Sequence, residues 1–303
     1  MIYKLELALS PEEAASQAMI ETAIKQHQAL AMDDKVNWKI ERRSIDARSK
    51  NIKIRLQLQV FINESPSPEE NFKGLIDQLP IADQKKCAYI IGCGPAGLYA
   101  ALTLLKYGVK PIIIEQGKNV KDRRRDLAAI NKQGLVNPNS NYCFGEGGAG
   151  TYSDGKLYTR SGSRNENVAV LNWLVAHGAN DQILIDAHPH IGTNKLPQII
   201  TAMRETIVAK GGEIWFNTVL EDIAHQQGKV VNITIRNLNT DADQIIVTNH
   251  LILATGHSAQ NVFKMLHNRN ILIQAKPFAL GVRIEHPQLI IDQAQYHCIA
   301  RSP

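Results

Sequence analysis

The sequence predicts an α/β protein in which a small α+β (βαββ) unit precedes a larger domain, built in three layers around a parallel sheet with an attached β-meander. Residues 1–62 have the pattern of strand, helix, strand, strand, and residues 87–115 that of strand, glycine turn, helix, strand. Residues 218–253 follow as a run of short strands. We place a linker at 63–86 and the larger domain at 87–303, with a substrate domain beginning after about residue 275.

The composition is that of an ordinary globular chain. Its 303 residues are 44% apolar and 21% charged, which suffices for one large core and a small one. The net charge of +5 is too small to require nucleic acid and is compatible with an anionic cofactor or substrate. Four cysteines without a CxxC pair, and no signal-type opening, lead us to expect a cytoplasmic protein.

One stretch imitates a membrane span. Residues 87–105 contain nineteen positions without a charge, close to the length that a spanning helix needs. Three glycines and a proline interrupt the stretch, so we interpret it as strand, turn and helix and expect no membrane association.

The first 62 residues form the predicted βαββ unit. Its strands are 1–9, 36–45 and 50–62, and its helix starts after Ser10 as N-cap with Pro11 in the first turn. The stretch from residue 35 to residue 55 contains eight Lys or Arg and two acids, Glu41 and Asp46. This excess of basic residues suggests either an anion or RNA surface or the solvated face of a hairpin. Aromatic residues for base stacking are scarce, with Trp38 and Phe61 nearby, so we favour the solvated face.

The central segment has the pattern of a dinucleotide-binding unit. A buried strand is followed by Gly92, Gly94 and Gly97 in GxGxxG spacing, by a helix, and by a second strand that ends at Glu115. In such a unit the pyrophosphate lies on the helix N-terminus, and an acid about 20 residues onward accepts hydrogen bonds from a ribose. The sequence therefore predicts a Rossmann-like domain with a bound dinucleotide.

The second half adds a helix at 196–212, a strand at 213–217, the three-stranded meander, and an apolar strand that ends in Ala254, Thr255 and Gly256. This order resembles the glutathione-reductase-like FAD-binding fold. More closely, residues 40–50, 141–160, 251–263 and 276–287 are similar to the bacterial FAD-dependent proteins described as NAD(FAD)-utilizing dehydrogenases. The similarity covers nearly the whole chain, and it implies FAD as cofactor, with NAD(P)H considered as the electron donor.

The resemblance also implies roles for individual residues. The pyrophosphate would be held by Gly92, Gly94, Pro95, Ala96 and Gly97, and the adenosine ribose by Glu115 with Gln116 beside it. Arg123 is a candidate phosphate or ribose contact, Val219 matches the backbone that meets the adenine, and Ala254, Thr255 and Gly256 would pass near the cofactor. The flavin ring or ribityl end would be lined by Gly147, Gly148, Ala149 and Gly150, with Ser153 and Asp154 as polar contacts.

Catalytic residues are not identified by any motif. Charged or polar side chains beside the segments expected near the flavin are candidates: Lys156, Arg160, His257, Lys276 and Arg283. His188 and His190 lack a cysteine or carboxylate partner pattern, so we predict no metal site. We interpret Cys143 as a packing residue because the paired cysteines of disulfide reductases are missing.

Related proteins continue well beyond the point where this sequence stops. We therefore expect a truncated member of the family, with weakened FAD binding and a strand-rich region barely begun after residue 287. The function expected is an FAD-dependent oxidoreductase that transfers hydride through flavin N5. Two alternatives stay open: an NAD(P)-binding protein, and a non-catalytic flavin protein whose basic N-terminal unit contacts RNA. The sequence does not identify the substrate or the oligomeric state.

Overall fold

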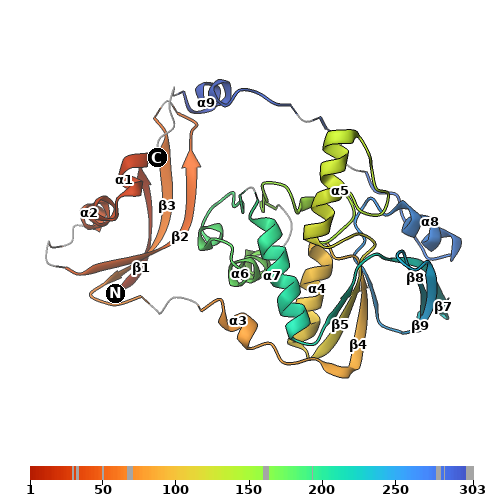
Figure 1. Ribbon diagram of the computed structural model, residues 1–303. Helices are drawn as coiled ribbons and strands as arrows, with labels where there is room; N and C mark the ends of the chain where they lie inside the picture. The colour runs from red at the N-terminus through yellow and green to blue at the C-terminus, as the bar shows by residue number, and fades with distance from the viewer. Residues whose placement is uncertain are drawn as a thin grey trace.

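The N-terminal unit is an antiparallel sheet with two short helices on one face (Figure 1). The structure, a computed structural model, describes residues 1–28, 31, 34–49, 51–66, 71–159, 164–192, 194–277, 281–282 and 284–297. The elements of the unit are β1 (Ile2–Leu9), α1 (Pro11–Ala15), α2 (Gln17–Gln28), β2 (Val36–Asp46) and β3 (Lys53–Ile62). The sheet order is β1-β3-β2, and alternate residues such as Leu5, Leu56 and Leu58 point into a separate core under the helices.

The helix of this unit begins where the sequence predicts. The Ser10 hydroxyl accepts a hydrogen bond from the Glu13 backbone N–H, and the Glu13 carboxylate accepts one from the Ser10 N–H. The two bonds form a complete capping box. The expectation of one helix in this unit is wrong, because Ser16 adopts an extended backbone that separates α1 from α2. The Ser16 side chain then accepts from the Met19 N–H and starts the second helix.

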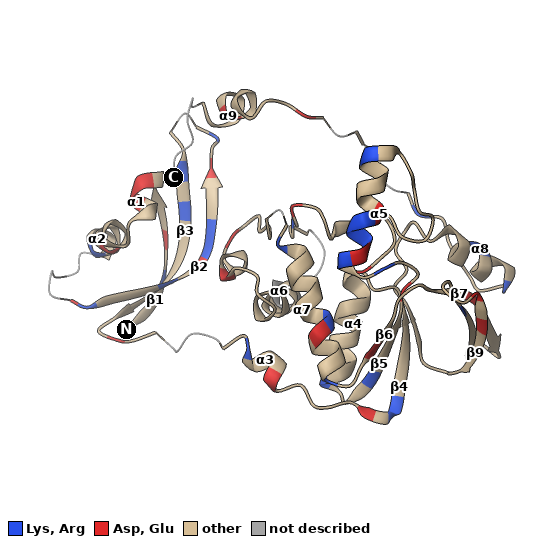
Figure 2. Ribbon diagram, in the orientation of Figure 1, with Lys and Arg blue, Asp and Glu red and all other residues tan. Residues whose placement is uncertain are grey.

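Basic residues lie on β2 and β3, and acidic residues are present in the same unit (Figure 2). Each of four cations pairs with a carboxylate: Lys4 with Glu41, Arg43 with Asp186, Arg48 with Asp46, and Arg55 with Glu6 and Asp46. Arg48 and Arg55 together hold the pKa of the Asp46 carboxyl well below its usual range through hydrogen bonds. Within the stretch from residue 35 to residue 55, Arg43, Arg48 and Arg55 are therefore paired with acids.

The segment between the two units contains structure that we had not predicted. A one-turn helix, α3 (Gly74–Asp77), lies within the expected linker, and β4 (Asp83–Ile91) begins inside it as well. The charged residues at the start of β4 are exposed, and the buried residues lie in the second half of the strand.

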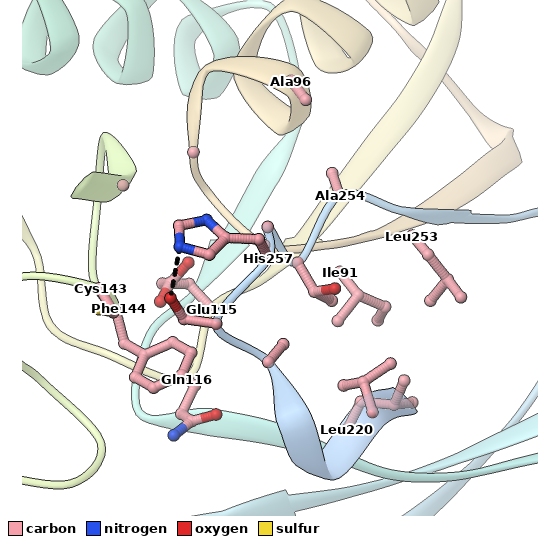
Figure 3. Close-up of a pocket in the computed structure, with 18 of the residues that line it drawn as sticks. Ile91, Ala96, Glu115, Gln116, Cys143, Phe144, Leu220, Leu253, Ala254 and His257 are labelled. Atoms are coloured by element: carbon pink, nitrogen blue, oxygen red, sulfur yellow. Dashed lines mark hydrogen bonds between the residues drawn. The ribbon is translucent and has the colours of Figure 1, made fainter. Parts of the chain in front are cut away.

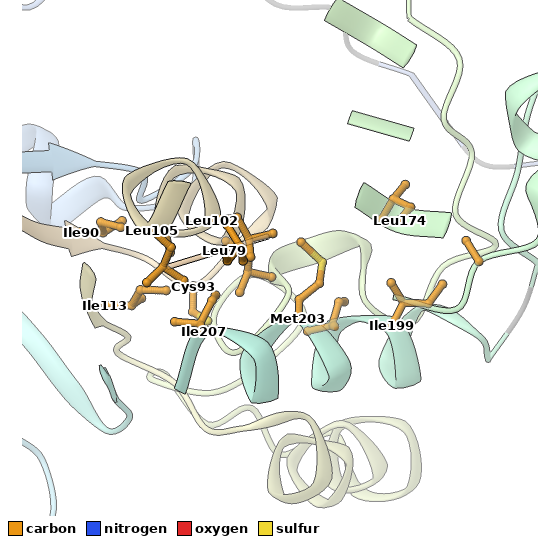
Figure 4. Close-up of a cluster of buried hydrophobic side chains, with 14 of the residues drawn as sticks. Leu79, Ile90, Cys93, Leu102, Leu105, Ile113, Leu174, Ile199, Met203 and Ile207 are labelled. Carbon is orange, nitrogen blue, oxygen red and sulfur yellow. The ribbon is translucent and has the colours of Figure 1, made fainter. Parts of the chain in front are cut away.

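The larger domain has the predicted three layers. Its parallel sheet has the order β10-β4-β5-β6, with β5 (Val109–Ile114), β6 (Glu213–Trp215) and β10 (Leu251–Leu253). Ile90 and Ile113 face α4 (Pro95–Lys106) and α7 (Leu196–Ala209) in a large apolar cluster (Figure 4). Their neighbours Ile91 and Ile114 point to the other side, toward the meander. Alternation along two adjacent strands thus joins both covering layers to one sheet.

The meander and the remaining helices complete the domain. The meander consists of β7 (Thr218–Gln226), β8 (Lys229–Asn237) and β9 (Ala242–Val247), and α8 (Gln260–Asn268) packs on β7. α5 (Val120–Gln133) contacts α7, while α6 (Arg164–Ala176) and a 3₁₀ turn (Asp181–Leu184) lie farther along the chain. None of the helices described here is long and apolar enough to cross a bilayer.

The end of the chain differs from the expectation of strands after residue 287. Residues Gln288–Tyr296 form a helix, α9, and residues 298–303 lie outside the described part. Gln295 and Tyr296 line a hollow that is also lined by Arg48 and Arg55, so α9 lies beside the N-terminal sheet (Figure 1).

Candidate functional site

A cavity of about 520 Å³ opens at the carboxyl ends of β4, β5 and β10 (Figure 3). Figure 3 shows the side chains of Glu115, Cys143 and Phe144 grouped at one side, with those of Ile91 and Leu253 at the other. Ligands of open α/β sheets bind at this edge, and the volume falls within the usual range for small-molecule sites.

The turn after β4 is closed so tightly that only glycine fits at two positions. A Cβ on Gly92, whose φ is +105°, would lie 2.4 Å from the Ala254 carbonyl oxygen, and one on Gly97 would lie 1.9 Å from the Gly92 oxygen. Gly94 is the N-cap of α4, with Pro95 as its first residue. The first turn of the helix, whose N–H groups lack intrahelical acceptors, therefore faces the cavity.

Glu115 is buried at the end of β5, yet it lines the cavity. One carboxylate oxygen, Oε2, accepts from the Cys93 N–H at 2.7 Å. The other, Oε1, accepts from the Gly117 N–H at 2.8 Å and the Gly145 N–H at 2.9 Å. A carboxylate offers about four acceptor positions, so one direction is left for a ligand.

The glycine-rich loop 141–155 lies over the turn after β4. The Gly147 N–H donates to the Cys93 carbonyl oxygen at 2.7 Å, and the Glu146 N–H donates to Lys118 O at 3.0 Å. A Cβ on Gly148 would lie 3.3 Å from the Gly94 Cα, so the two backbones almost touch. This loop and the turn after β4 thus form two walls of one cavity.

An ion pair between a buried carboxylate and a partly exposed arginine holds the loop on the side away from the cavity. The side chain of Glu146 is fully buried; Oε1 accepts from Arg204 Nε at 2.8 Å and Oε2 from the Val120 N–H at 2.7 Å. Burial raises the pKa of Glu146, while the bonds from Val120 and Arg204 act in the opposite direction. The sequence reasoning missed both residues, although a carboxylate between two glycines was an available signal.

Most of the residues expected at the cofactor do line the cavity: Gly92, Gly94, Pro95, Ala96, Glu115, Gln116, Gly148, Ala149, Val219, Ala254, Thr255 and Gly256. His257 lines it too, with Nε2 at 3.3 Å from Ser258 Oγ. Lining residues that we had not named are Ile91, Cys143, Phe144, Gly145, Leu220, Leu253, Ser258, Ala259, Asn261, Val262, Phe263 and Leu266. Four of these residues, Asn261, Val262, Phe263 and Leu266, belong to α8, which begins shortly after the Ala254–Gly256 segment.

Several expected residues are absent from the lining, among the residues that the structure describes: Gly97, Arg123, Gly147, Gly150, Ser153, Asp154, Lys156 and Lys276. Gly147 packs against Thr151 and Ile200, Ser153 donates to the Gly150 carbonyl, and Asp154 pairs with Lys156 at 3.2 Å. Arg123, expected as a phosphate or ribose contact, is fully buried within α5. Arg160 and Arg283 lie outside the described residues.

Two expectations about single side chains can be compared with the structure. Cys143 is exposed and lines the cavity, so the packing role expected for it is wrong. The His188 ring lies against the Tyr158 ring in a tilted arrangement, with centroids 4.7 Å apart and the planes at 51°. No cluster of three or more metal-ligand side chains is found over the described ranges.

Two protein-family models match the chain. A model described as an FAD binding domain matches residues 86–261, which is 176 of the 303 residues, and a domain of unknown function matches residues 1–61. An uncharacterized protein of Clostridium beijerinckii is 38% identical over 279 residues, covering 88% of this chain and 51% of its own length. The chain thus spans about half of that relative.

The solved structures that resemble the chain are distant. One is THI4 of Thermovibrio ammonificans, at 16% identity and a TM-score of 0.41, covering 66% of this chain and 67% of that one. Another is glycerol-3-phosphate dehydrogenase of Bacillus halodurans complexed with FAD, at 14% identity and a TM-score of 0.39, covering 63% and 38%.

Proposed function

Because the chain belongs to the FAD-binding domain family and has FAD as its cofactor, we propose that it is an FAD-dependent oxidoreductase acting on a small molecule. The observation that carries the proposal is one cavity in which a glycine turn, a helix N-terminus and a buried carboxylate meet at the ends of parallel strands. The glycine turn and the helix N-terminus suit an anion such as a pyrophosphate, and the carboxylate suits ribose hydroxyls.

The residues present fit this cofactor. The contacts of Gly92 and Gly97 with neighbouring backbone leave no room for a Cβ, which keeps the turn tight enough for a pyrophosphate to approach. The unused acceptor position on Glu115 suits a ribose hydroxyl. No Lys or Arg is among the lining residues described, so the α4 N-terminus would supply the positive potential for the phosphates.

The chain's own residues would bind, orient and shield the cofactor. We assign the pyrophosphate to Gly92, Gly94 and Ala96, and the ribose to Glu115. The loop 141–155 would cover the same part of the molecule, since Gly145 is bonded to Glu115 and Gly148 adjoins Gly94. A bound flavin accepts hydride at N5, and the protein contributes orientation and exclusion of water. Hydride transfer by this route, with NAD(P)H as electron donor, is part of the proposal.

The proposal is tested by ligand titration of the flavin-free chain. FAD is expected to raise the melting temperature by several degrees at a concentration about 100 times Kd. NAD and NADP serve as matched nucleotides that lack the flavin. Stabilisation by NAD without stabilisation by FAD would contradict the FAD assignment. Bound flavin that is not bleached by NADH or NADPH under anaerobic conditions would contradict the assignment of the donor.

A further inference from the structure

Arg123 is a buried cation whose donors all point at one loop. Its Nε donates to the Asn141 carbonyl at 2.9 Å and its Nη2 to the Tyr142 carbonyl at 3.1 Å. Its Nη1 lies 2.8 Å from Glu146 O, 3.1 Å from Thr151 Oγ1 and 3.3 Å from Gly145 O. The guanidinium therefore fixes the conformation of the loop, because its hydrogen bonds join both ends of the segment from Asn141 to Thr151 to one side chain.

The loop is shaped around this side chain. A Cβ on Gly145 would lie 2.4 Å from Arg123 Cδ, and the φ of Gly145 is +123°. Glycine is required there both for the backbone conformation and for the passage of the arginine. The Tyr152 ring closes the opposite side, 5.6 Å from the guanidinium carbon.

The loop conformation that Arg123 imposes places two backbone donors of the site. The Gly145 N–H reaches Glu115 Oε1 at 2.9 Å, and the Gly147 N–H reaches the Cys93 carbonyl at 2.7 Å. One bond fixes the carboxylate assigned to the ribose and the other the turn assigned to the pyrophosphate. Arg123 contacts neither, because it lies behind the loop and is absent from the cavity lining.

We propose that Arg123 is a positioning residue that shapes the loop 141–151 before FAD binds, so that the covering wall of the cofactor site exists in the ligand-free protein. This rests on the proposed FAD-binding function. It also changes the role expected for Arg123, from a contact with the cofactor to a template for the loop that meets it.

The chain offers a matched control, since Arg123, Arg124 and Arg125 are consecutive in α5 and the last two are exposed. A lysine at 123 keeps the charge but has three donors from a single nitrogen, too few and too closely spaced for five acceptors. Arg123→Lys is therefore expected to loosen the loop, whereas Arg125→Lys is expected to leave it unchanged.

Two readouts separate the template role from its alternatives. In the FAD-free protein, amide hydrogen exchange at Gly145 and Gly147 is expected to be about tenfold faster in Arg123→Lys than in the wild type, since the buried hydrogen bonds that hold the loop closed are lost. The Kd for FAD, measured by flavin fluorescence, is expected to rise about tenfold or more in the same variant.

Unchanged exchange with a raised Kd would overturn the proposal, because it would mean that Arg123 contacts the cofactor itself. Unchanged exchange with an unchanged Kd would overturn it as well. If the wild type binds no FAD, the proposed function fails, while the exchange comparison still tests the template role.

Arg123→Lys could prevent folding, so a milder variant provides a second test. Thr151→Val removes one acceptor of Arg123 and the hydroxyl donor to the Glu146 carbonyl, with a side chain of nearly the same shape. Faster exchange confined to the loop and a Kd raised about threefold to tenfold are expected. Wild-type exchange and affinity in Thr151→Val would overturn the proposal.

Discussion

Two buried carboxylates, Glu115 and Glu146, accept hydrogen bonds from backbone N–H groups around the glycine-rich loop. Glu115 collects three N–H groups from three separate segments, and Glu146 joins the start of α5 to Arg204 on α7. A buried N–H without an acceptor is costly, so each carboxylate determines where these segments meet.

Glu115→Gln tests this role at the site. The amide keeps one oxygen but turns an NH₂ group toward backbone donors, which leaves at least one buried N–H without an acceptor. We expect the Kd for FAD to rise about tenfold or more and the free energy of unfolding to fall by about 1–3 kcal/mol. FAD titration and chemical denaturation measure the two effects. Glu205→Gln, at an exposed position of α7, is the control, and equal behaviour of the two variants would contradict the role.

The sequence allowed some residues of the site to be predicted and not others. GxGxxG spacing predicts that Gly92, Gly94 and Glu115 lie together, and all three line the cavity, because local chain geometry places them at the ends of adjacent strands. The role of Arg123 depends on a loop that is distant in sequence. Its place between buried Val120 and Leu127, on the inward stripe of α5, was nevertheless a signal, because an arginine on such a stripe needs acceptors nearby.

At the scale of elements, prediction succeeded where periodicity and punctuation agree. The β4-turn-α4-β5 unit and the amphipathic α7, with Ile199, Met203 and Ile207 buried, follow directly from the sequence pattern. The break at Ser16 could not be predicted, since serine also occurs within helices. The helix α9 was not predicted either, because we expected a strand-rich region after residue 287. The start of β4 escaped notice because its first residues are exposed and charged.

His177 connects two helices through hydrogen bonds from both of its ring nitrogens. It directly follows α6, with Nδ1 2.7 Å from the Trp173 carbonyl and Nε2 3.1 Å from Thr206 Oγ1 on α7. Burial lowers the pKa of His177 below its ordinary value of 6.5, against a smaller opposing effect of the Trp173 carbonyl. The neutral ring, donating from Nδ1 and accepting at Nε2, fits this environment.

Because the folded-state pKa is lowered, the unfolded chain binds the proton more readily. Stability from this residue is complete above pH 6.5 and is lost as the pH falls below that value. We expect melting temperatures between pH 8 and about pH 5 to fall more steeply in the wild type than in His177→Asn. Parallel curves for the two proteins would contradict the assignment. His267→Asn, at the exposed end of α8, is the control.

At the scale of the whole molecule, two cores are joined at a narrow contact. The N-terminal sheet has its own apolar cluster, separate from the clusters on the two sides of the parallel sheet. The free edge of β2 meets the segment 185–187, where the Arg43 N–H donates to the Ile185 carbonyl and the Ala187 N–H to the Arg43 carbonyl. A register shift between Ile40 and Arg42 precedes this contact and is of the kind that redirects side chains.

This contact continues toward the cofactor site. Residues following 187 pair with the end of the glycine-rich loop, as the Leu157 N–H donates to the Pro189 carbonyl and the Ile191 N–H to the Gly155 carbonyl. The N-terminal sheet is therefore bonded to the segment that supports the loop, which gives the small unit a physical connection to the site.

Arg43→Ala tests whether the side chain secures that connection. Its Nε lies 2.8 Å from Asp186 Oδ1, and its Nη2 lies 3.3 Å from the Gln182 side chain. The pair is partly exposed, so its loss is expected to cost no more than about 1 kcal/mol and to leave the fold intact. Opening at the contact should nevertheless increase about fivefold, because the ion pair with Asp186 and the bond to Gln182 would both be lost beside the two backbone bonds. Hydrogen exchange at the Ala187 amide measures this opening, with Arg42→Ala, an exposed neighbour, as control. If Ala187 exchanges equally fast in both variants and in the wild type, the backbone bonds suffice, and the ion pair plays no part in holding the two cores together.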